Sequence, residues 1–366
     1  MQESSISRSL SRSFASRRAA HPVSAANRVA VSEIFKEPAS PILVQSLAPE
    51  LMLAAWIGEH RDEVQSMLCD NGAVLFRGFD VRDAGAFRAG AQSISPHLIQ
   101  YGERSSPRTQ VADDVYTATD HPRDQPIVLH HEQSYTLNWP MKIMFFCECP
   151  ATHRGRTPTA ANRRVLDRLP SQMIERFAEK GVMYLRNYLP GISLSWQEAF
   201  QTDSKEKVEA HCEKNRIEAE WTNEGVLRTR QVRPAFRNHP ITGETLFFNH
   251  ALFFHVTSLP DRVKFDLLAT ISKESLPYNT YYGDGSPLED ETLESLRSAF
   301  DAETRAFDWQ AGDVLVLDNM LVAHGREPFE GARRVLTVMA DPVAELFGAP
   351  SATPRFEGPF VTRNRT

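Results

Sequence analysis

The sequence predicts a mainly β domain of the α+β class, with a sheet core and helical insertions. Short apolar segments of strand length recur along the chain, and segments with helical spacing lie between them. No internal repeat or second compositional regime divides the 366 residues, so one large domain is favoured over two. The composition agrees, because 21 phenylalanines suit a sheet core and 41% hydrophobic residues suffice for a sizeable one.

Residues 1–35 are expected to form a disordered tail, and residues 36–366 a single folded domain. The tail is rich in Ser, Ala and Arg, is poor in acidic residues and has no apolar stretch that would serve as a secretory signal. A mitochondrial transit peptide has the same composition and stays open as an alternative. Elsewhere four irregularly spaced cysteines imply no disulfide framework, which favours a reducing, cytoplasmic location.

Charge and hydropathy exclude two classes of partner. The net charge is −6, from 41 basic and 47 acidic residues, whereas nucleic-acid-binding proteins usually carry a basic face. The longest apolar stretches, 143–147 and 314–317, are far shorter than the roughly 20 residues of a membrane span. We therefore expect a small-molecule substrate and neither a nucleic-acid nor a membrane partner.

The elements are expected in an alternating order. Asn71-Gly72 should end the first helix, since glycine commonly follows a helix C-terminus. The helical segments are expected at 48–70, 81–94, within 163–215 and at 262–273. The strands are expected at 73–79, 127–132, 142–149, 221–234, 246–249, 314–317 and 333–339, with loops over 100–127.

Residues with metal-binding chemistry lie at two strand ends. His130 and Glu132 are two residues apart on a strand, so their side chains point the same way and His131 points the other way. His324 follows the buried strand at 314–317 and can supply a third ligand. Two histidines and one carboxylate on one side of a metal form the facial triad of non-haem Fe(II) oxygenases. The open positions suit a bidentate 2-oxo acid and dioxygen.

Two further pairs of residues carry a chemical signal. Arg333 and Arg334 enter an apolar strand about ten residues after His324, and a guanidinium suits the distal carboxylate of a 2-oxo acid. Cys147 and Cys149 form a C-x-C pair in an apolar strand. Because no second pair accompanies them, core cysteines are favoured over a thiolate metal site.

The order of these motifs resembles the taurine dioxygenase and clavaminate synthase-like family of Fe(II)- and 2-oxoglutarate-dependent oxygenases. The resemblance extends over most of the chain. Its motifs are Asn71–Phe79, Leu129–Glu132, Arg156–Pro158, Phe248–Asn249, Tyr281–Gly285, Trp309–Asp313, Asp318–Asn319 and His324–Arg326. Residues 103–108 and 318–326 are most similar to the natural-product branch of the family, which includes the syringomycin-pathway aspartate hydroxylase.

The resemblance implies a double-stranded β-helix, or jelly-roll, core and a set of site residues. It implies iron ligation by His130, Glu132 and His324, with 2-oxoglutarate and dioxygen as co-substrates. Thr157 matches the threonine that contacts 2-oxoglutarate, although the family usually has Gly-Gly-x-Thr and this chain has Arg154 in place of the first glycine. Arg334 matches the arginine that binds the distal carboxylate, and the adjacent arginine is expected to face the opposite side of the strand.

The activity implied is hydroxylation of an aliphatic C–H in an amino acid or amino-acid-derived substrate, in antibiotic or other natural-product biosynthesis. The substrate is free or tethered to a peptidyl carrier protein. Desaturation, epoxidation and cyclisation remain alternative outcomes, whereas Glu132 argues against halogenation because halogenating relatives lack this carboxylate. A zinc hydrolase usually shows H-E-x-x-H, which is absent, and the complete triad argues against a non-catalytic jelly-roll binding protein.

Substrate contacts are expected from four further residues, each with a simpler alternative. Arg104 and Arg108 flank a Ser-Ser-Pro loop and can bind a substrate carboxylate or the phosphopantetheine arm of a carrier; a solvated loop is the alternative. Tyr135 and Asn249 are expected near the pocket by motif position, with packing or a turn as the alternative.

Overall fold

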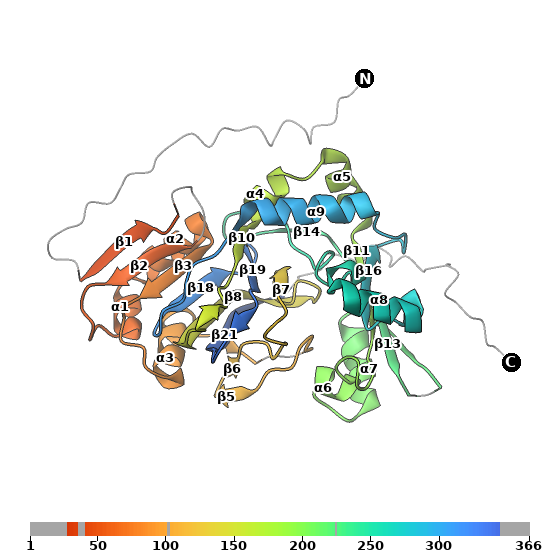
Figure 1. The fold of residues 1–366 in the computed structure, drawn as a ribbon, viewed down its shortest axis with the longest axis horizontal. Helices are drawn as coiled ribbons and strands as arrows, with labels where there is room; N and C mark the ends of the chain where they lie inside the picture. Colours follow the sequence, from red (N-terminus) through yellow and green to blue (C-terminus); the bar gives the residue numbers. More distant parts are fainter. Residues whose placement is uncertain (1–27, 36–40, 101–102, 224, 345–366) are drawn as a thin grey trace, which may run out of the picture.

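The computed structural model describes residues 28–35, 41–100, 103–223 and 225–344. Figure 1 shows a central group of strands with α1–α3 on one side and a helical insertion that includes α8 on the other. None of the helices in the described ranges has the length and apolar character that a membrane span requires.

Two β-sheets form the core. The large sheet has the order β1-β2-β3-β18-β8-β21-β6-β5, with β4 also paired to β21, and the smaller one has the order β17-β10-β19-β7. The strands of the large sheet are β1 (Val29–Glu33), β2 (Ile42–Ser46), β3 (Ala73–Arg77), β4 (Leu98–Ile99), β5 (Gln110–Ala112), β6 (Val115–Thr117), β8 (Asn138–Cys149), β18 (Val314–Asp318) and β21 (Arg334–Ala344). The strands of the smaller sheet are β7 (Ile127–His130), β10 (Thr159–Ala161), β17 (Thr304–Arg305) and β19 (Val322–Arg326).

An apolar cluster joins the two sheets and confirms the predicted jelly-roll core. Phe145 of β8, Leu315 of β18 and Val322 of β19 belong to this cluster. The neighbouring residues of β8, Met144 and Phe146, contribute to a second cluster with the helices that cover the other face of the large sheet. The central strands are thus buried on both faces, which explains their continuous apolar sequence.

Three helices cover the outer face of the large sheet: α1 (Leu53–Glu59), α2 (Arg61–Asn71) and α3 (Ala84–Ile94). The helix predicted over 48–70 is therefore present as two helices that meet at His60. Gly72 follows α2 with a φ of 76°, the left-handed conformation that glycine adopts readily. The predicted helix end is confirmed.

The remaining elements include an insertion beside the jelly roll. The sheet of the insertion has the order β12-β13-β11-β16. Two short strand pairs, β14-β15 and β20-β9, are separate from this sheet. These strands are β9 (His153–Arg154), β11 (Val182–Asn187), β12 (Glu218–Trp221), β13 (Leu227–Arg233), β14 (Phe236–Asn238), β15 (Thr245–Phe247), β16 (Tyr278–Tyr282) and β20 (Phe329–Glu330). The helices are α4 (Asn162–Asp167), α5 (Ser171–Lys180), α6 (Trp196–Phe200), α7 (Lys205–Lys214), α8 (Asp261–Thr270) and α9 (Asp290–Glu303), with 3-10 turns η1 (Val256–Ser258) and η2 (Lys273–Ser275).

Several features differ from the expected elements. β1 pairs antiparallel with β2, so Val29–Glu33, predicted to belong to the disordered tail, form a strand; residues 1–27 lie outside the described residues. β5 and β6 lie in the segment predicted as loops over 100–127. β11 lies where helices were expected over 163–215, because a strand buried at every position shows no alternation. Helix α9 was not predicted. Cys147, by contrast, lies in the apolar cluster between the sheets, as expected for a core cysteine.

Candidate active site

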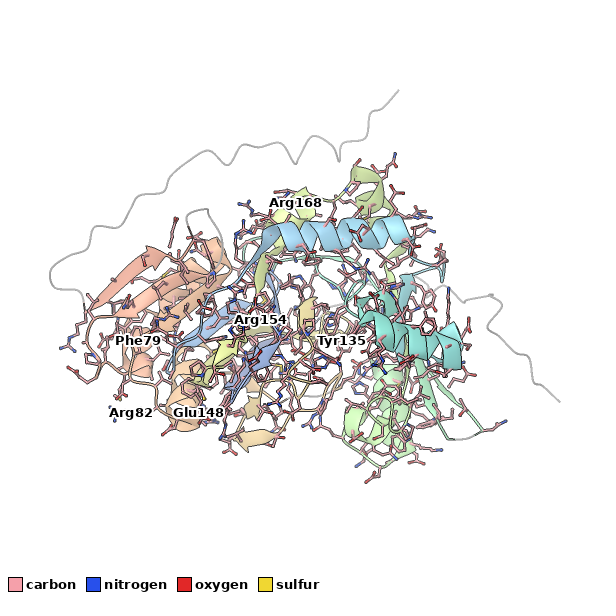
Figure 2. All side chains as sticks on the ribbon, in the orientation of Figure 1. Phe79, Arg82, Tyr135, Glu148, Arg154 and Arg168 are labelled. Carbon is pink, nitrogen blue, oxygen red and sulfur yellow. The ribbon has the colours of Figure 1, made fainter. Side chains whose placement is uncertain are left out.

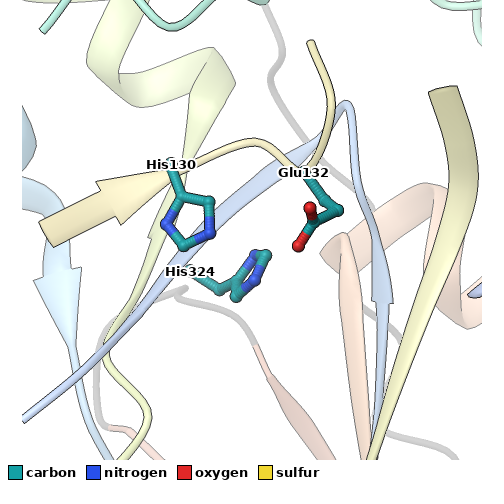
Figure 3. Close-up of side chains that lie close together, drawn as sticks. All are labelled: His130, Glu132 and His324. Carbon is teal, nitrogen blue, oxygen red and sulfur yellow. The ribbon is translucent and has the colours of Figure 1, made fainter. Parts of the chain in front are cut away.

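Three predicted metal ligands lie together at the β7–β19 strand pair. His130 ends β7, Glu132 follows in the next turn, and His324 lies on β19 directly opposite His130 in the antiparallel register. One candidate ligand atom from each lies within 4.8 Å of the others (Figure 3). Within the described part of the chain, this is the one group of three His, Cys, Asp or Glu side chains with metal-binding geometry.

The two histidines have the protonation state that a metal requires. Burial lowers the pKa of His130, and it lowers the pKa of His324 well below the ordinary value, so both imidazoles are neutral near pH 7. The Nδ1 of His130 lies 2.9 Å from the Val128 carbonyl oxygen, so Nδ1–H donates there and Nε2 keeps a lone pair.

A buried nitrogen of His324 supports the same conclusion. Among the described residues, no hydrogen-bond partner lies near its Nδ1. A buried polar atom usually has a partner. A metal ion held by His130, Glu132 and His324 would provide a partner for the His324 ring. The residues present therefore fit a divalent metal such as Fe(II).

Glu132 is held by both its side chain and its backbone. The Arg108 Nη2 donates to Glu132 Oε2 at 2.6 Å. The Glu132 N–H donates to Asn319 Oδ1 at 2.7 Å, and Asn319 Nδ2 donates to the Glu132 carbonyl oxygen at 2.8 Å. Arg108 is buried, so the alternative of a solvated loop residue is wrong.

His131 points away from the ligands, as the strand alternation predicted. Its Nδ1 lies 2.7 Å from the Asn319 carbonyl oxygen and its Nε2 lies 3.2 Å from the Asn162 amide nitrogen. Burial lowers the pKa of His131 to about 4, so the ring is neutral and donates from Nδ1 while it accepts at Nε2. This ring ties the ligand segment to the turn that precedes β19.

The two arginines at the start of β21 face opposite ways, but in the order opposite to the prediction. Arg334 is 53% exposed in its side chain and pairs with Glu148 at 2.7 Å. Arg333 donates from Nε to the Gly155 carbonyl oxygen at 2.9 Å, and burial, with the nearby Arg326 cation, lowers its pKa to about 10. The expectation that Arg334 faces the site is therefore wrong.

The pairing of β21 with β8 explains this correction. Arg334 lies opposite Cys149 and Val335 lies opposite Cys147, so Glu148 is an extra residue on β8 and the register shifts. Val335 belongs to the cluster between the sheets, and alternation from it places Arg333 on the inner side.

The segment next to Arg333 carries the predicted threonine. Thr157 is buried two residues after Gly155, whose carbonyl oxygen Arg333 contacts. The Thr157 Oγ1 accepts a hydrogen bond from Trp309 Nε1 at 3.1 Å. Arg333 thus contacts the backbone two residues before Thr157, the residue expected to contact 2-oxoglutarate.

The substrate candidates have different surroundings. Tyr135 is fully buried and donates from its hydroxyl to the Glu103 carbonyl oxygen at 2.9 Å. Figure 2 shows Tyr135 on the side of the molecule that carries the insertion. Asn249 donates to the Ala235 carbonyl oxygen at 3.0 Å and accepts from a backbone N–H in its own turn, which fits the turn alternative. The Arg104 backbone carbonyl accepts from a buried guanidinium at 2.9 Å.

Sequence reasoning missed one wall of the site. Phe253 stacks on His130 with ring centroids 4.4 Å apart, and His250 meets the same ring edge-on at 5.9 Å. The hydroxyl of Ser134 lies 2.5 Å from His250 Nδ1, which fixes that ring. Nothing in the sequence distinguishes Phe253 from a core phenylalanine, since its role depends on the insertion folding back over β7.

Comparisons with known proteins agree with this geometry. The chain matches the family model described as taurine catabolism dioxygenase TauD, TfdA family, over residues 41–340. It is 40% identical over 280 residues to the dapdiamide synthesis protein DdaC of Enterobacter agglomerans, covering 76% of this chain and 85% of that protein. It is 29% identical over 313 residues to a clavaminate synthase-like protein of Arabidopsis thaliana, covering 83% and 91% of the two chains.

The fold is also found in a solved structure. The PvcB protein of Pseudomonas aeruginosa aligns with a TM-score of 0.53 at 15% identity, over 88% of this chain and 94% of that chain. A second structure of PvcB, described as an Fe, alpha-ketoglutarate dependent oxygenase from an isonitrile synthetic pathway, gives a TM-score of 0.52. With the family model spanning most of the folded part, the chain belongs to the TauD/TfdA dioxygenase family and is an Fe(II)- and 2-oxoglutarate-dependent oxygenase.

Proposed function

We propose that this oxygenase hydroxylates an aliphatic C–H of an amino acid or amino-acid-derived substrate during natural-product biosynthesis. The observation that carries the proposal is the 40% identity to a protein named for dapdiamide synthesis, which covers 85% of that relative. The substrate is free or tethered to a peptidyl carrier protein. Desaturation, epoxidation and cyclisation require the same cofactors and remain the alternative outcomes.

The proposed metal ligands are His130, Glu132 and His324. Iron with 2-oxoglutarate and dioxygen supplies the oxidising power, and the protein supplies orientation and a pocket without bulk water. Neutral imidazoles and a buried carboxylate suit Fe(II), and no side chain has to act as a general base. The stacked ring of Phe253 keeps His130 in one orientation and gives the site an apolar wall.

The proposed 2-oxoglutarate contacts are Thr157 and Arg333. Arg333 replaces Arg334 in this role because its side chain is on the inner side, next to the segment that carries Thr157. A partly buried guanidinium binds a carboxylate through two parallel hydrogen bonds and so fixes both position and angle. Arg104 remains the proposed contact for a substrate carboxylate.

A screen for stimulated succinate release tests the proposal. Amino acids are offered free and loaded on a carrier protein, with Fe(II) and 2-oxoglutarate, and the His324→Ala variant is the control. We expect one substrate group to raise succinate release and to gain one oxygen atom, detected by mass spectrometry. Product formation without 2-oxoglutarate would contradict the proposal, as would release that His324→Ala retains.

A further inference from the structure

Arg108 and Glu132 form a buried ion pair at the centre of the metal site. Arg108 lies in the loop before β5, far from the ligands in sequence, and its Nη2 reaches Glu132 Oε2 at 2.6 Å. The two side chains are only 5% and 4% exposed. A charged pair with so little solvent is costly unless its geometry is well satisfied, so the contact has to be explained.

The contact with Arg108 engages a carboxylate oxygen of Glu132 that a metal could otherwise bind. Oε2 accepts from the guanidinium, while the backbone N–H and carbonyl oxygen of Glu132 are both hydrogen-bonded to the Asn319 side chain. A facial triad keeps its open positions only when the carboxylate binds the metal through one oxygen. A cation that is hydrogen-bonded to Oε2 competes with a metal for that oxygen and so opposes two-oxygen binding.

From these contacts we propose that Arg108 is a positioning residue that keeps Glu132 a one-oxygen ligand and so preserves the position that a 2-oxo acid needs. The proposal rests on the proposed function, because it assumes that Glu132 binds the metal. It also reassigns Arg108, whose sequence-based expectation was contact with a substrate carboxylate. Because Glu132 already compensates the charge of Arg108, a second carboxylate gains less from it.

The test measures metal binding and 2-oxoglutarate binding separately. Arg108→Gln and Arg108→Lys are compared with Arg77→Gln, which breaks another ion pair to a buried carboxylate, Arg77–Asp313 at 2.7 Å, outside the metal site. Mn(II) affinity is measured by electron paramagnetic resonance. The affinity for 2-oxoglutarate is measured without oxygen, from the charge-transfer absorption of the Fe(II)-loaded protein. Thermal unfolding of each metal-free variant reports on folding.

We expect Arg108→Gln to bind Mn(II) at least as tightly as the wild type, because a cation next to the site is gone. Its affinity for 2-oxoglutarate should fall about tenfold, because two-oxygen binding by Glu132 would take a position that the 2-oxo acid needs. Arg108→Lys keeps the charge but not the planar guanidinium. Its affinity for 2-oxoglutarate should lie between those of the wild type and Arg108→Gln. Arg77→Gln should lower thermal stability without changing the ratio of the two affinities.

Two results would overturn the proposal. If Arg108→Gln loses affinity for Mn(II) and for 2-oxoglutarate to the same extent, and its thermal stability falls as well, then the ion pair has only a structural role. If 2-oxoglutarate affinity is unchanged and only the KM for the substrate rises, then Arg108 binds substrate. Absence of Mn(II) binding by the wild-type protein is a different result, since it contradicts the proposed function itself.

Discussion

The proposed metal end and the proposed co-substrate end of the site are built differently. At the metal end, His130 ends β7, Glu132 follows it in the next turn, and His324 lies opposite His130 in the strand pair. At the co-substrate end, Arg333 sits where β21 begins, next to an extra residue on β8. Close spacing in the sequence therefore predicted that His130 and Glu132 come together, although Glu132 lies in the turn after the strand, whereas the facing of a residue at a strand start depends on the partner strand.

The largest expected effect comes from breaking the metal end. His324→Ala removes one of the proposed ligands, so we expect the purified protein to lose its iron and its succinate release to reach background. Iron content by atomic absorption and 2-oxoglutarate turnover are the measurements. His153→Ala, which removes an exposed histidine on β9, is the matched control and should keep both. Iron bound at the wild-type stoichiometry in His324→Ala would contradict the proposed ligand set.

The co-substrate end gives the next largest effect. Arg333→Gln removes the inner guanidinium, so we expect 2-oxoglutarate affinity to fall about 10- to 100-fold, as for losing a hydrogen bond to a charged group. Arg334→Gln breaks only a half-exposed pair with Glu148 and should change affinity by less than about fivefold. The measurement is a 2-oxoglutarate titration of both variants. The opposite order of effects would restore the family-based assignment of Arg334.

The contrast between local spacing and contacts with a partner element also separates what the sequence predicts of this fold and site from what it does not. The strand that carries His130, the helix end at Gly72 and the jelly-roll core could be predicted because each depends on local spacing or on a motif. The strand that carries His324, β19, was not predicted, since the sequence placed this histidine only after the buried strand at 314–317. β11 could not be predicted, because a strand buried on both sides lacks alternation. Nor could the contact of Arg108 with Glu132, since it joins a loop to a ligand across the fold.

An effect on stability is expected from the two hydrogen bonds between the Asn319 side chain and the Glu132 backbone. Asn319→Ala leaves the buried N–H and carbonyl groups of Glu132 without their side-chain partner, which should cost about 2–4 kcal/mol of unfolding free energy. Asn319→Asp keeps an acceptor for the N–H but places a buried carboxyl group against the carbonyl oxygens of Glu132 and Pro140, so it should cost at least as much. Urea unfolding of the metal-free variants measures both. A loss below about 1 kcal/mol in Asn319→Ala would show that the amide does not stabilise the fold through these hydrogen bonds.

A buried histidine outside both ends separates the effect of burial from that of metal binding. The ring of His255 lies 2.8 Å from the Thr257 hydroxyl, and burial, with the Arg297 cation next in importance, lowers its pKa from 6.5 to about 4. Between these two pH values the unfolded chain binds the proton and the folded protein does not. This contribution to stability is therefore complete above pH 6.5 and is lost as the pH falls towards 4.

The loss associated with His255 should reach about 3 kcal/mol at the acidic limit, from about 1.4 kcal/mol for each pKa unit. The variant His255→Asn has no proton to take up, so its unfolding free energy should depend less steeply on pH than that of the wild type. Because other buried histidines titrate in the same range, the quantity to compare is the difference between the two proteins at each pH. That difference should shrink as the pH falls from 6.5, and parallel curves from urea unfolding would show that His255 takes up its proton equally in both states.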